Sequence, residues 1–256
     1  MIKGQSAATE RKVRGLMQLC DINLRIVKSI SERHRRKTKY FHFDLHAGSG
    51  WNAELGIVGS PLAFTYTAEA VRTPYVMHAI DIDEHKARSL ADKLAGDANS
   101  FVKVGDNSEL ALEIPDIVRA HGENPRYAYG SIFIDPFGAV NQTPWRELAW
   151  VMKNCPKLDV IINFPSTGMK RLPKGHSDCV RIDDLPSMLS KQHWLIRDTD
   201  GPWQFVLCIG RNFKSNDYKS AGFYHWGDDK GVDIRRRSVH TREELIAMSQ
   251  RKFAGF

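Results

Sequence analysis

The sequence FHFDLHAGSG occupies residues 41–50, and it predicts a buried strand that ends in a glycine-rich loop. Apolar and aromatic residues lead into Asp44. The small residues that follow His46 are Ala47, Gly48, Ser49 and Gly50. Glycine permits tight turns and close approach to a ligand, because it has no Cβ atom. Such a loop, placed after a strand of a parallel sheet, surrounds a nucleotide-like ligand with backbone N–H groups. A tight turn without a ligand would have the same sequence. The rest of the chain is needed to distinguish a ligand-binding loop from such a turn.

Length and composition indicate an ordinary globular protein. The 256 residues are enough for one large domain with a full core, or for a domain with a small appendage. No apolar run approaches the roughly 18 residues of a membrane span, and the N-terminus lacks the apolar segment of a signal peptide. We therefore expect a cytoplasmic protein that is not bound to a membrane.

The four cysteines are widely spread and form no CxxC pair, which predicts reduced, mostly buried thiols. His176 and Cys179 are three residues apart, but no second pair of ligands accompanies them. No metal site is predicted.

The net charge of +7 is unevenly distributed. Residues 1–40 carry 11 Lys/Arg against 3 Asp/Glu, and residues 210–256 carry 10 against 6. The stretch between them is mildly acidic, with 16 against 21. Basic ends beside a catalytic domain favour a partner that bears phosphates, such as nucleic acid. A solvated basic helix face is the alternative.

Hydrophobic periodicity predicts alternating strands and helices. A helix is expected over residues 8–33, followed by the charge run from Arg33 to Lys39. The expected strands are 40–45, 75–80, 100–104, 129–134 and 158–163. The expected helices between and after them are 62–71, 84–94, 109–121, 144–154 and 182–191, and a last helix is expected over 241–252. Ser60 is the expected N-cap of the helix that Pro61 begins. Residues 193–197 and 203–211 have the pattern of a hairpin.

This alternation predicts a mostly parallel sheet with helices on both faces and an antiparallel hairpin at its C-terminal end. Ligands bind beyond the carboxyl ends of the strands in such a sheet. Polar motifs follow five predicted strands in succession: Asp44–Gly50, Asp81/Asp83, Asp106-Asn107, Asp135–Gly138 and Asn163–Ser166. Over residues 40–211 this arrangement resembles the class I S-adenosylmethionine-dependent methyltransferases, which have a seven-stranded Rossmann-like fold.

The resemblance implies S-adenosyl-L-methionine as cofactor. It implies that the loop Asp44, His46, Ala47, Gly48 and Gly50 holds the amino-acid part and the sulfonium region. Asp81 or Asp83 would bind the ribose hydroxyls, and Asp106 would meet the adenine amine with Asn107 beside it. Each of these acids could instead cap a helix. A nicotinamide-dependent dehydrogenase is disfavoured, because the loop AGSGWNA lacks the third glycine of GxGxxG and because of the terminal hairpin.

The tetrapeptide Asp135-Pro136-Phe137-Gly138 bears on the methyl acceptor. It resembles the acid/amide-Pro-Pro-aromatic motif of amino-methyltransferases that act on adenine or cytosine in nucleic acid, but it has one proline instead of two. The resemblance implies that Asp135 and the Pro136 region accept hydrogen bonds from the target amine, and that Phe137 stacks on the extruded base. Alternatively, Pro136 and Phe137 only shape the loop.

A second resemblance covers most of residues 40–172. The succession DL-AG-G, GSPL, an acidic strand end, GD, DPFG and INFP with a nearby Arg171 is similar to the three-Cys-motif partner protein (TcmP) family. His46 stands where that family commonly has Phe. The family implies a methyltransferase-like fold and leaves the substrate open.

The prediction is a methyltransferase that acts on an exocyclic base amine of DNA or RNA. Residues 1–39 would be a basic helical extension, 40–211 the methyltransferase domain and 212–256 a basic and aromatic extension packed on it. Phosphates would be held by basic residues of two loops: Arg35, Arg36, Lys170, Arg171 and Lys174. Phe223, Tyr224, Trp226 and Arg235–Arg237 could bind bases, or form a small hydrophobic lid. A small-molecule or protein acceptor, and a non-catalytic partner protein, remain as alternatives.

Overall fold

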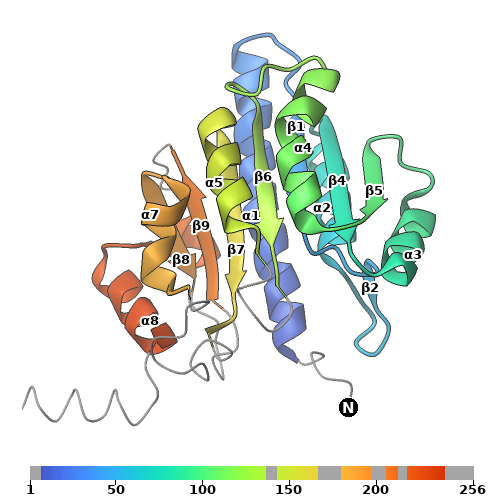
Figure 1. Cartoon of the computed structure of the whole chain (residues 1–256). Helices are drawn as coiled ribbons and strands as arrows, with labels where there is room; N and C mark the ends of the chain where they lie inside the picture. The colour runs from blue at the N-terminus through green and yellow to red at the C-terminus, as the bar shows by residue number, and fades with distance from the viewer. Residues whose placement is uncertain (1–6, 137–142, 167–179, 198–205, 213–217, 240–256) are drawn as a thin grey trace, which may run out of the picture.

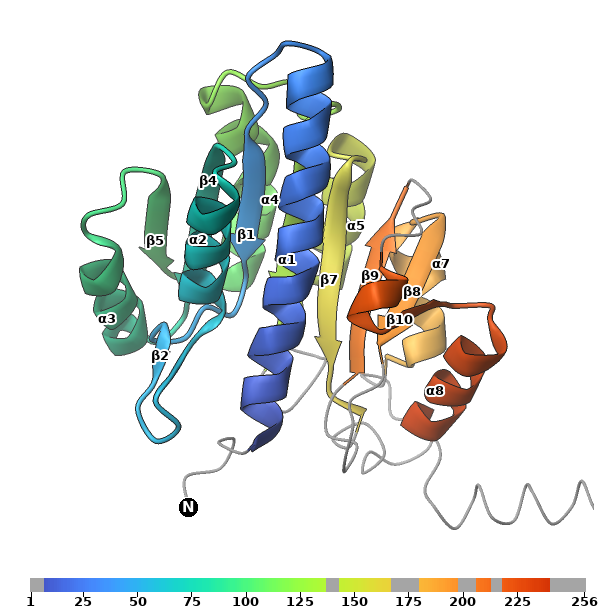
Figure 2. The ribbon, with the colours of Figure 1, turned by 180° about the vertical axis from the view of Figure 1, so that it is seen from behind.

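The chain folds around a single large sheet. The structure is a computed structural model that describes residues 7–136, 143–166, 180–197, 206–212 and 218–239. Eight strands form the sheet in the order β10-β8-β9-β7-β6-β1-β4-β5 (Figures 1 and 2). Their bounds are β1 Tyr40–Asp44, β4 Tyr75–Asp81, β5 Ser100–Val104, β6 Tyr129–Ile134, β7 Leu158–Phe164, β8 His193–Arg197, β9 Val206–Arg211 and β10 Phe223–His225.

Helices cover both faces of the sheet, as predicted. On one face lie α1 (Ala7–Arg33), α2 (Ser60–Val71) and α3 (Glu84–Leu94). On the other lie α4 (Asn107–Ala120), α5 (Trp145–Asn154), α7 (Leu185–Leu189) and α8 (Asp229–Val239). Successive strand residues alternate between the two cores: Phe41 and Phe43 belong to one, and Tyr40 belongs to the other. The central strand β1 is therefore buried on both sides, as a parallel strand between two helical layers must be.

The strand order creates a topological switch point between β1 and β6. β1 pairs in parallel with β4 on one side and with β6 on the other. The chain thus continues from β1 to one half of the sheet and later crosses to the other half, and a doubly wound sheet has its ligand crevice where the strand order reverses in this way. Ligands of doubly wound sheets bind in such crevices. Asp44 ends β1 and Asp135 follows β6, so both lie at the switch point.

The hairpin prediction is confirmed. β9 runs antiparallel to both β7 and β8, so it is inserted between two strands that are parallel to each other. This is the arrangement that the methyltransferase resemblance implies. The sheet has eight strands rather than seven, because β10 adds an antiparallel edge strand beside β8.

The helix α1 is a structural part of the domain. Its buried side chains Leu16, Leu19 and Leu24 join the same core as α2 and the sheet. Asn23, on the same stripe, donates a hydrogen bond to the Tyr40 hydroxyl over 3.3 Å and accepts one from the Tyr218 hydroxyl. These contacts fix the helix along its length, so that its N-terminal half is held at the carboxyl edge of the sheet (Figure 2).

Several local predictions differ from the structure. Gly59, not Ser60, is the N-cap of α2, and no side chain caps that helix. The ribbon of β2 (Trp51–Asn52) and β3 (Ile57–Val58), the strand β10 and the helix α8 were not predicted. Short 3₁₀ turns, η2 (Ile182–Asp184) and η3 (Lys219–Ala221), complete the fold. The helix expected over 241–252 lies outside the described residues. Among the described helices, none is long and apolar enough to cross a membrane.

Candidate active site

The glycine-rich loop lies at the switch point and is bonded to both neighbouring strands. The Leu45 N–H donates to the Phe133 carbonyl of β6, and the Ala47 N–H donates to the Ile80 carbonyl of β4, both over 3.1 Å. Gly48 then adopts a positive φ of 62°, a conformation that favours glycine. A Cβ atom added at Gly48 would meet nothing within 4 Å. The loop therefore presents open space at Gly48, where a ligand could approach the backbone closely.

Gly50 has a structural role that the sequence did not reveal. It is buried, with φ at 72°, and a Cβ atom there would lie 2.6 Å from the Leu90 Cδ1 atom of α3. Its carbonyl accepts a 2.7 Å hydrogen bond from the Gly59 N–H, and a Cβ atom on Gly59 would come within 3.0 Å of the Gly50 backbone. The two glycines thus dock the loop onto the start of α2. Gly50 therefore fixes the shape of the glycine-rich loop and does not itself face the open space at Gly48.

Asp44 is a buried acid at the carboxyl end of β1. Its side chain is fully inaccessible, one oxygen accepts the His46 N–H over 3.0 Å, and Oδ2 has no hydrogen-bond partner among the described residues. Burial raises the pKa of Asp44 to about 7, the Ser60 hydroxyl and the His46 N–H oppose this, and the negative charges of Asp135 and Asp81 add to it. A cationic or hydroxyl ligand would satisfy the buried oxygen.

The two acids after β4 have different roles. Asp81 faces the loop, where its Oδ2 accepts the Gly48 N–H over 2.8 Å and its Oδ1 accepts the Asp83 N–H over 2.9 Å. Asp83 caps α3 through its Oδ1, which accepts the N–H groups of His85 and Lys86, and these bonds lower its pKa. Of the two predicted ribose ligands, Asp81 therefore has the better position. Between them, Ile82 is 77% exposed.

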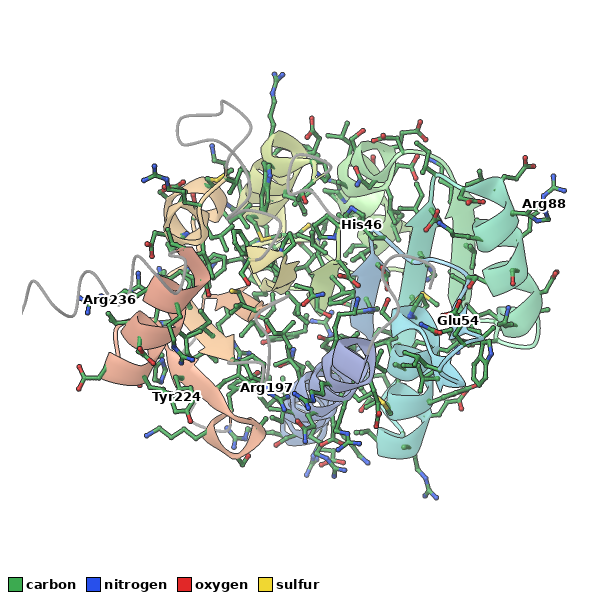
Figure 3. All side chains as sticks on the ribbon, turned by 90° about the horizontal axis from the view of Figure 1, so that it is seen from below. His46, Glu54, Arg88, Arg197, Tyr224 and Arg236 are labelled. Atoms are coloured by element: carbon green, nitrogen blue, oxygen red, sulfur yellow. The ribbon has the colours of Figure 1, made fainter. Side chains whose placement is uncertain are left out.

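Asp106 and Asn107 follow β5 as predicted, yet they take different positions. Asp106 is exposed and caps α4 by accepting hydrogen bonds from Ser108, which lower its pKa. Asn107 turns inward, and its side-chain amide lies 3.0 Å from His46 Nε2. The opposite ring nitrogen of His46, Nδ1, accepts the Asp135 N–H over 3.4 Å. His46 thus links the loop after β1 to the loops after β5 and β6. Figure 3 labels His46 in a view onto this end of the molecule.

Asp135 is the half-buried acid at the end of β6, and both of its oxygens are engaged. Asn163, at the end of β7, donates to Oδ1 over 2.6 Å. The ammonium of Lys12 on α1 lies 2.5 Å from Oδ2. Pro136 is buried. Asn163 is almost fully buried, whereas Lys12 and Asp135 keep 21% and 16% of their side chains exposed. Solvent can therefore reach the pair of Lys12 and Asp135.

The remaining predicted site residues fall into two groups. Phe137, Lys170, Arg171 and Lys174 lie outside the described residues. Arg35 and Arg36 lie in the loop between α1 and β1, at the amino edge of the sheet. There Arg36 pairs with Glu123 at 2.5 Å. Since an α-helix rises about 1.5 Å per residue, this loop is on the order of 30 Å from Lys12. Arg35 and Arg36 are therefore not part of the crevice.

The aromatic and basic residues near the C-terminus are largely engaged with each other. Phe223 is buried, and Tyr224 is 37% exposed. The Arg235 guanidinium lies 5.0 Å from the centre of the Trp226 ring and pairs with Asp183 of η2. Arg237 pairs with Asp233 at 2.8 Å. Of the two interpretations, this arrangement fits the small hydrophobic lid better than an open platform for bases.

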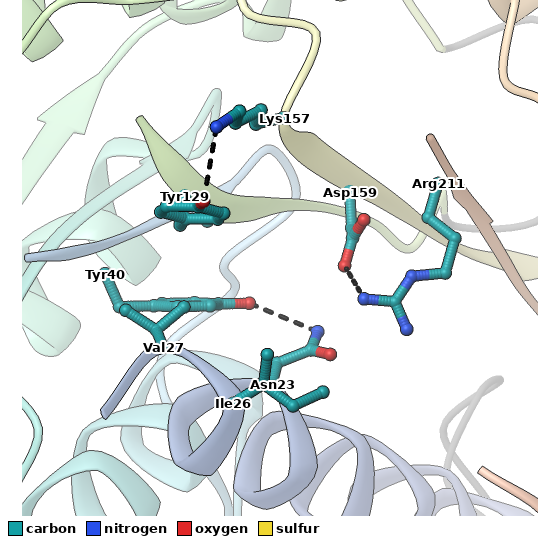
Figure 4. A pocket seen from close by; sticks show the side chains of 9 residues that line it. Asn23, Ile26, Val27, Tyr40, Tyr129, Lys157, Asp159 and Arg211 are labelled. Carbon is teal, nitrogen blue, oxygen red and sulfur yellow. Dashed lines mark hydrogen bonds and ion pairs between the residues drawn. The ribbon is translucent and has the colours of Figure 1, made fainter. Parts of the chain in front are cut away.

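A second polar cluster lies at the amino end of the sheet, and it is structural. Arg211 and Asp159 form a buried ion pair at 3.1 Å beside Tyr40 and Asn23 (Figure 4). Burial raises the pKa of Asp159 to about 6, while Arg211 and Lys191 lower it. The cavity between these side chains is about 10 Å³, no larger than a single water requires. It cannot hold a substrate.

Comparison with known proteins supports the fold and goes no further. No protein-family profile and no curated protein sequence matches the chain. The structure of protein LPL1258 from Legionella pneumophila is similar, with a TM-score of 0.54 at 13% identity over 84% of this chain and 90% of that one. A putative methyltransferase from Thermobifida fusca gives a TM-score of 0.47 at 15% identity over 78% and 77%. Aeropyrum pernix fibrillarin with natively bound S-adenosyl-L-methionine gives 0.41 at 11% identity over 68% and 67%.

At such identities the first likeness establishes a shared fold, and the two weaker ones carry no argument about function. The Rossmann-like fold with a mostly parallel sheet is confirmed. The resemblance to the three-Cys-motif partner family is supported by no family profile, and it stays a prediction. Within the described residues, no three His, Cys, Asp or Glu side chains are grouped so that they could hold a metal ion.

The structure adds site residues that the sequence did not identify. Lys12 is the most informative, because it stands on the buried stripe of α1 that continues through Leu16, Cys20 and Asn23. A lysine on the apolar face of a helix is an unusual placement, and this signal was available in the sequence. The role of Asn163 depends on its neighbours in the sheet, which no local pattern specifies.

Proposed function

We propose that this chain is a methyltransferase that uses S-adenosyl-L-methionine and methylates an exocyclic base amine of nucleic acid. One observation carries the proposal. Asp44, Gly48, Asp81 and Asp135 come from three separate strand ends and meet at the switch point of a doubly wound sheet. Ligands of such sheets bind at that point. The hydrogen-bonding groups of these four residues match the polar groups of this cofactor and of an amine that receives the methyl group.

The described residues fit the cofactor. Asp81 uses one lone pair of each oxygen for backbone N–H groups, and a carboxylate has about four acceptor sites, so two remain for ribose hydroxyls. The exposed Ile82 offers an apolar surface beside them for the adenine ring. The space at Gly48 and the unpartnered Oδ2 of Asp44 suit the charged amino-acid end. When bound, S-adenosyl-L-methionine supplies a methyl group on a positively charged sulfur.

Asp135 would orient the acceptor. Asn163 and His46 fix the carboxylate and its backbone N–H, so its direction is set before an acceptor arrives. A carboxylate oxygen accepts an N–H hydrogen bond from the amine, which turns the nitrogen lone pair toward the methyl group. Transfer of that methyl group would form an N–C bond, break the C–S bond and leave the nitrogen positively charged, so that the nitrogen would give up a proton. Asp135 would receive that proton. Orientation of this kind supplies much of the rate of a displacement reaction.

The basic regions favour a polyanionic acceptor. The strongly basic first 40 residues include α1, whose N-terminal half lies at the carboxyl edge of the sheet (Figure 2). Positive charge near a site raises the local concentration of nucleic acid through its phosphates. Arg35 and Arg36, at the other edge, would contact only an extended nucleic acid that passes along α1.

A methyl-transfer assay tests the proposal. The wild-type chain is incubated with tritiated S-adenosyl-L-methionine and with separate pools of DNA, RNA, protein and small molecules. We expect label in DNA or RNA. Asp135→Ala should lower the transfer rate at least about 100-fold, since it removes the group that orients the amine and takes its proton. The same variant should bind S-adenosylhomocysteine with a largely unchanged Kd.

The outcomes separate the alternatives. Label found only in protein or small molecules would mean that the proposed acceptor is wrong and that the proposed methyl transfer is right. Binding of S-adenosylhomocysteine without transfer to any pool would favour the non-catalytic partner protein. Equal loss of binding and transfer in Asp135→Ala would contradict the role given to Asp135. Asp135→Asn, which keeps one acceptor oxygen, should retain more activity than Asp135→Ala.

A further inference from the structure

Lys12 lies beside Asp135, the residue that would hold the acceptor amine. It reaches from α1 to the end of β6, where its Nζ is 2.5 Å from the Asp135 Oδ2 atom. Both side chains remain partly exposed. An ion pair that keeps contact with solvent contributes little to stability, so stability alone does not account for a lysine on this face of the helix.

The position of Lys12 is set by the fold. The next two turns of α1 are anchored by Leu16, Leu19 and Cys20 in the core. Farther along, Asn23 bonds to Tyr40, and the Lys28 ammonium donates to the Val71 carbonyl over 3.0 Å. The lysine therefore extends from a rigid helix, and its distance from Asp135 follows from packing rather than from a chance surface contact.

Together the two side chains present a hydrogen-bond acceptor and a donor side by side. A carboxylate can only accept, and an ammonium can only donate. The side chains of Asn and Gln carry the same combination, and they recognise adenine by accepting from its amine and donating to the adjacent ring nitrogen. The pair of Lys12 and Asp135 reproduces this combination with atoms from two elements. Asn163 holds the other oxygen of Asp135 and keeps the carboxylate in place.

We propose that Lys12 and Asp135 together recognise an amine that stands beside a ring nitrogen with a free lone pair. Adenine, through N6 and N1, and cytosine, through N4 and N3, have this edge. The guanine edge with N1–H beside the amine would place a donor against the Lys12 donor. The proposal rests on the proposed function, and it assigns the acceptor class to a residue of α1. Asp135 would accept a hydrogen bond from the amine, and Lys12 would donate one to the ring nitrogen and so distinguish the base.

The test uses nucleic acid in which the ring nitrogen is removed. Single-stranded DNA and RNA oligonucleotides of random sequence are prepared with natural bases, with 1-deazaadenine for adenine, or with 3-deazacytosine for cytosine. Each is given to the wild type, Lys12→Met and Lys12→Arg. Met keeps the apolar stem and loses the donor, and Arg keeps a donor. The matched control is Arg14→Met, which removes an exposed charge two residues away on the same helix.

We expect the Lys12→Met substitution and the deaza base to lower kcat/KM by the same amount, and the two together to lower it no further than either alone. The wild type should methylate the natural oligonucleotides on adenine or cytosine, and replacing that base by its deaza form should lower kcat/KM on the order of 10- to 100-fold. Lys12→Met should show the same loss on natural oligonucleotides and no further loss on the deaza form. Lys12→Arg should still discriminate between the two. Arg14→Met should weaken both substrates equally, through the phosphates.

Three results would overturn the proposal. One is a wild type that methylates the deaza oligonucleotides as well as the natural ones. Another is a combined loss in kcat/KM that equals the product of the Lys12→Met loss and the deaza loss, because the two effects would then be independent. The third is loss of S-adenosylhomocysteine binding in Lys12→Met, because Lys12 would then serve the fold or the cofactor. Failure of the proposed function looks different, since the wild type would transfer no methyl group to any natural oligonucleotide.

Discussion

Asp44 makes the stability of the protein depend on pH in a way that one substitution should remove. Burial raises the pKa of Asp44 from 3.8 to about 7 in the folded chain. Each tenfold change in a protonation equilibrium is worth about 1.4 kcal/mol. Ionising Asp44 in the folded chain therefore costs on the order of 4 kcal/mol more than in the unfolded chain. Because the side chain is fully buried, solvent does little to reduce this cost.

The sign follows from the direction of the shift. Below about pH 4 the carboxyl is protonated in both the folded and the unfolded chain, and the stabilisation from its raised pKa is complete. As the pH rises toward 7, the unfolded chain releases the proton first, so the free energy of unfolding decreases. Above 7 both states are ionised, and the full cost remains. Asp44→Asn cannot ionise and should lack this decrease.

The assay is urea unfolding followed by the fluorescence of the six tryptophans, at pH 5, 6, 7 and 8. The free energy of unfolding of the wild type minus that of Asp44→Asn should fall by a few kcal/mol across this series. The buried amide group of Asn carries its own cost of about 1–3 kcal/mol, which is independent of pH and does not affect the slope. Asp92→Asn, at an exposed position on α3, controls for the change in net charge.

A difference that stays constant from pH 5 to pH 8 would refute this reasoning. It would mean that Asp44 is ionised in the folded chain throughout, and that its surroundings solvate the charge far better than a buried position should. A difference that rises with pH would reverse the sign and refute it as well.

Substitutions of the two loop glycines should separate folding from ligand binding. Gly50→Ala should lower the free energy of unfolding by about 2–4 kcal/mol, because it combines a positive φ with a Cβ atom 2.6 Å from Leu90. Gly48→Ala meets no neighbour, so it should cost only about 1–2 kcal/mol of stability, yet it should weaken S-adenosylhomocysteine binding. Urea unfolding and calorimetry measure the two effects. Equal destabilisation by both variants would contradict the packing described for Gly50.

Much of the fold could be predicted because its elements carry local signals. The strands 100–104 and 129–134 and the helix 84–94 have the predicted bounds, since apolar runs and good helix formers alternate there without ambiguity. The short ribbon of β2 and β3 and the edge strand β10 could not be predicted. They have two or three residues each and form through pairing with distant or adjacent segments, which periodicity does not detect.

The sequence predicted that the candidate-site residues lie together, but not the contacts that each of them makes. Strand ends in a parallel sheet meet at one edge, so the motifs that contain Asp44, Asp81 and Asp135 were bound to converge. Whether an acid caps a helix or faces the glycine-rich loop depends on one backbone turn. For this reason Asp83 caps α3, whereas Asp81 faces the loop. Lys12 is 123 residues from Asp135 in the chain, and only the packing of α1 brings them together.

The central claim is that the crevice at the end of β1 holds S-adenosyl-L-methionine, with Asp81 on the ribose. Isothermal titration of the full chain with S-adenosylhomocysteine tests it most directly, on the wild type, Asp81→Ala and Asp83→Ala. We expect saturable binding by the wild type, near-complete loss in Asp81→Ala, and binding with only a reduced melting temperature in Asp83→Ala, which loses a helix cap. A wild type that binds no S-adenosylhomocysteine would contradict the claim, and unchanged binding by Asp81→Ala would contradict the role of that residue.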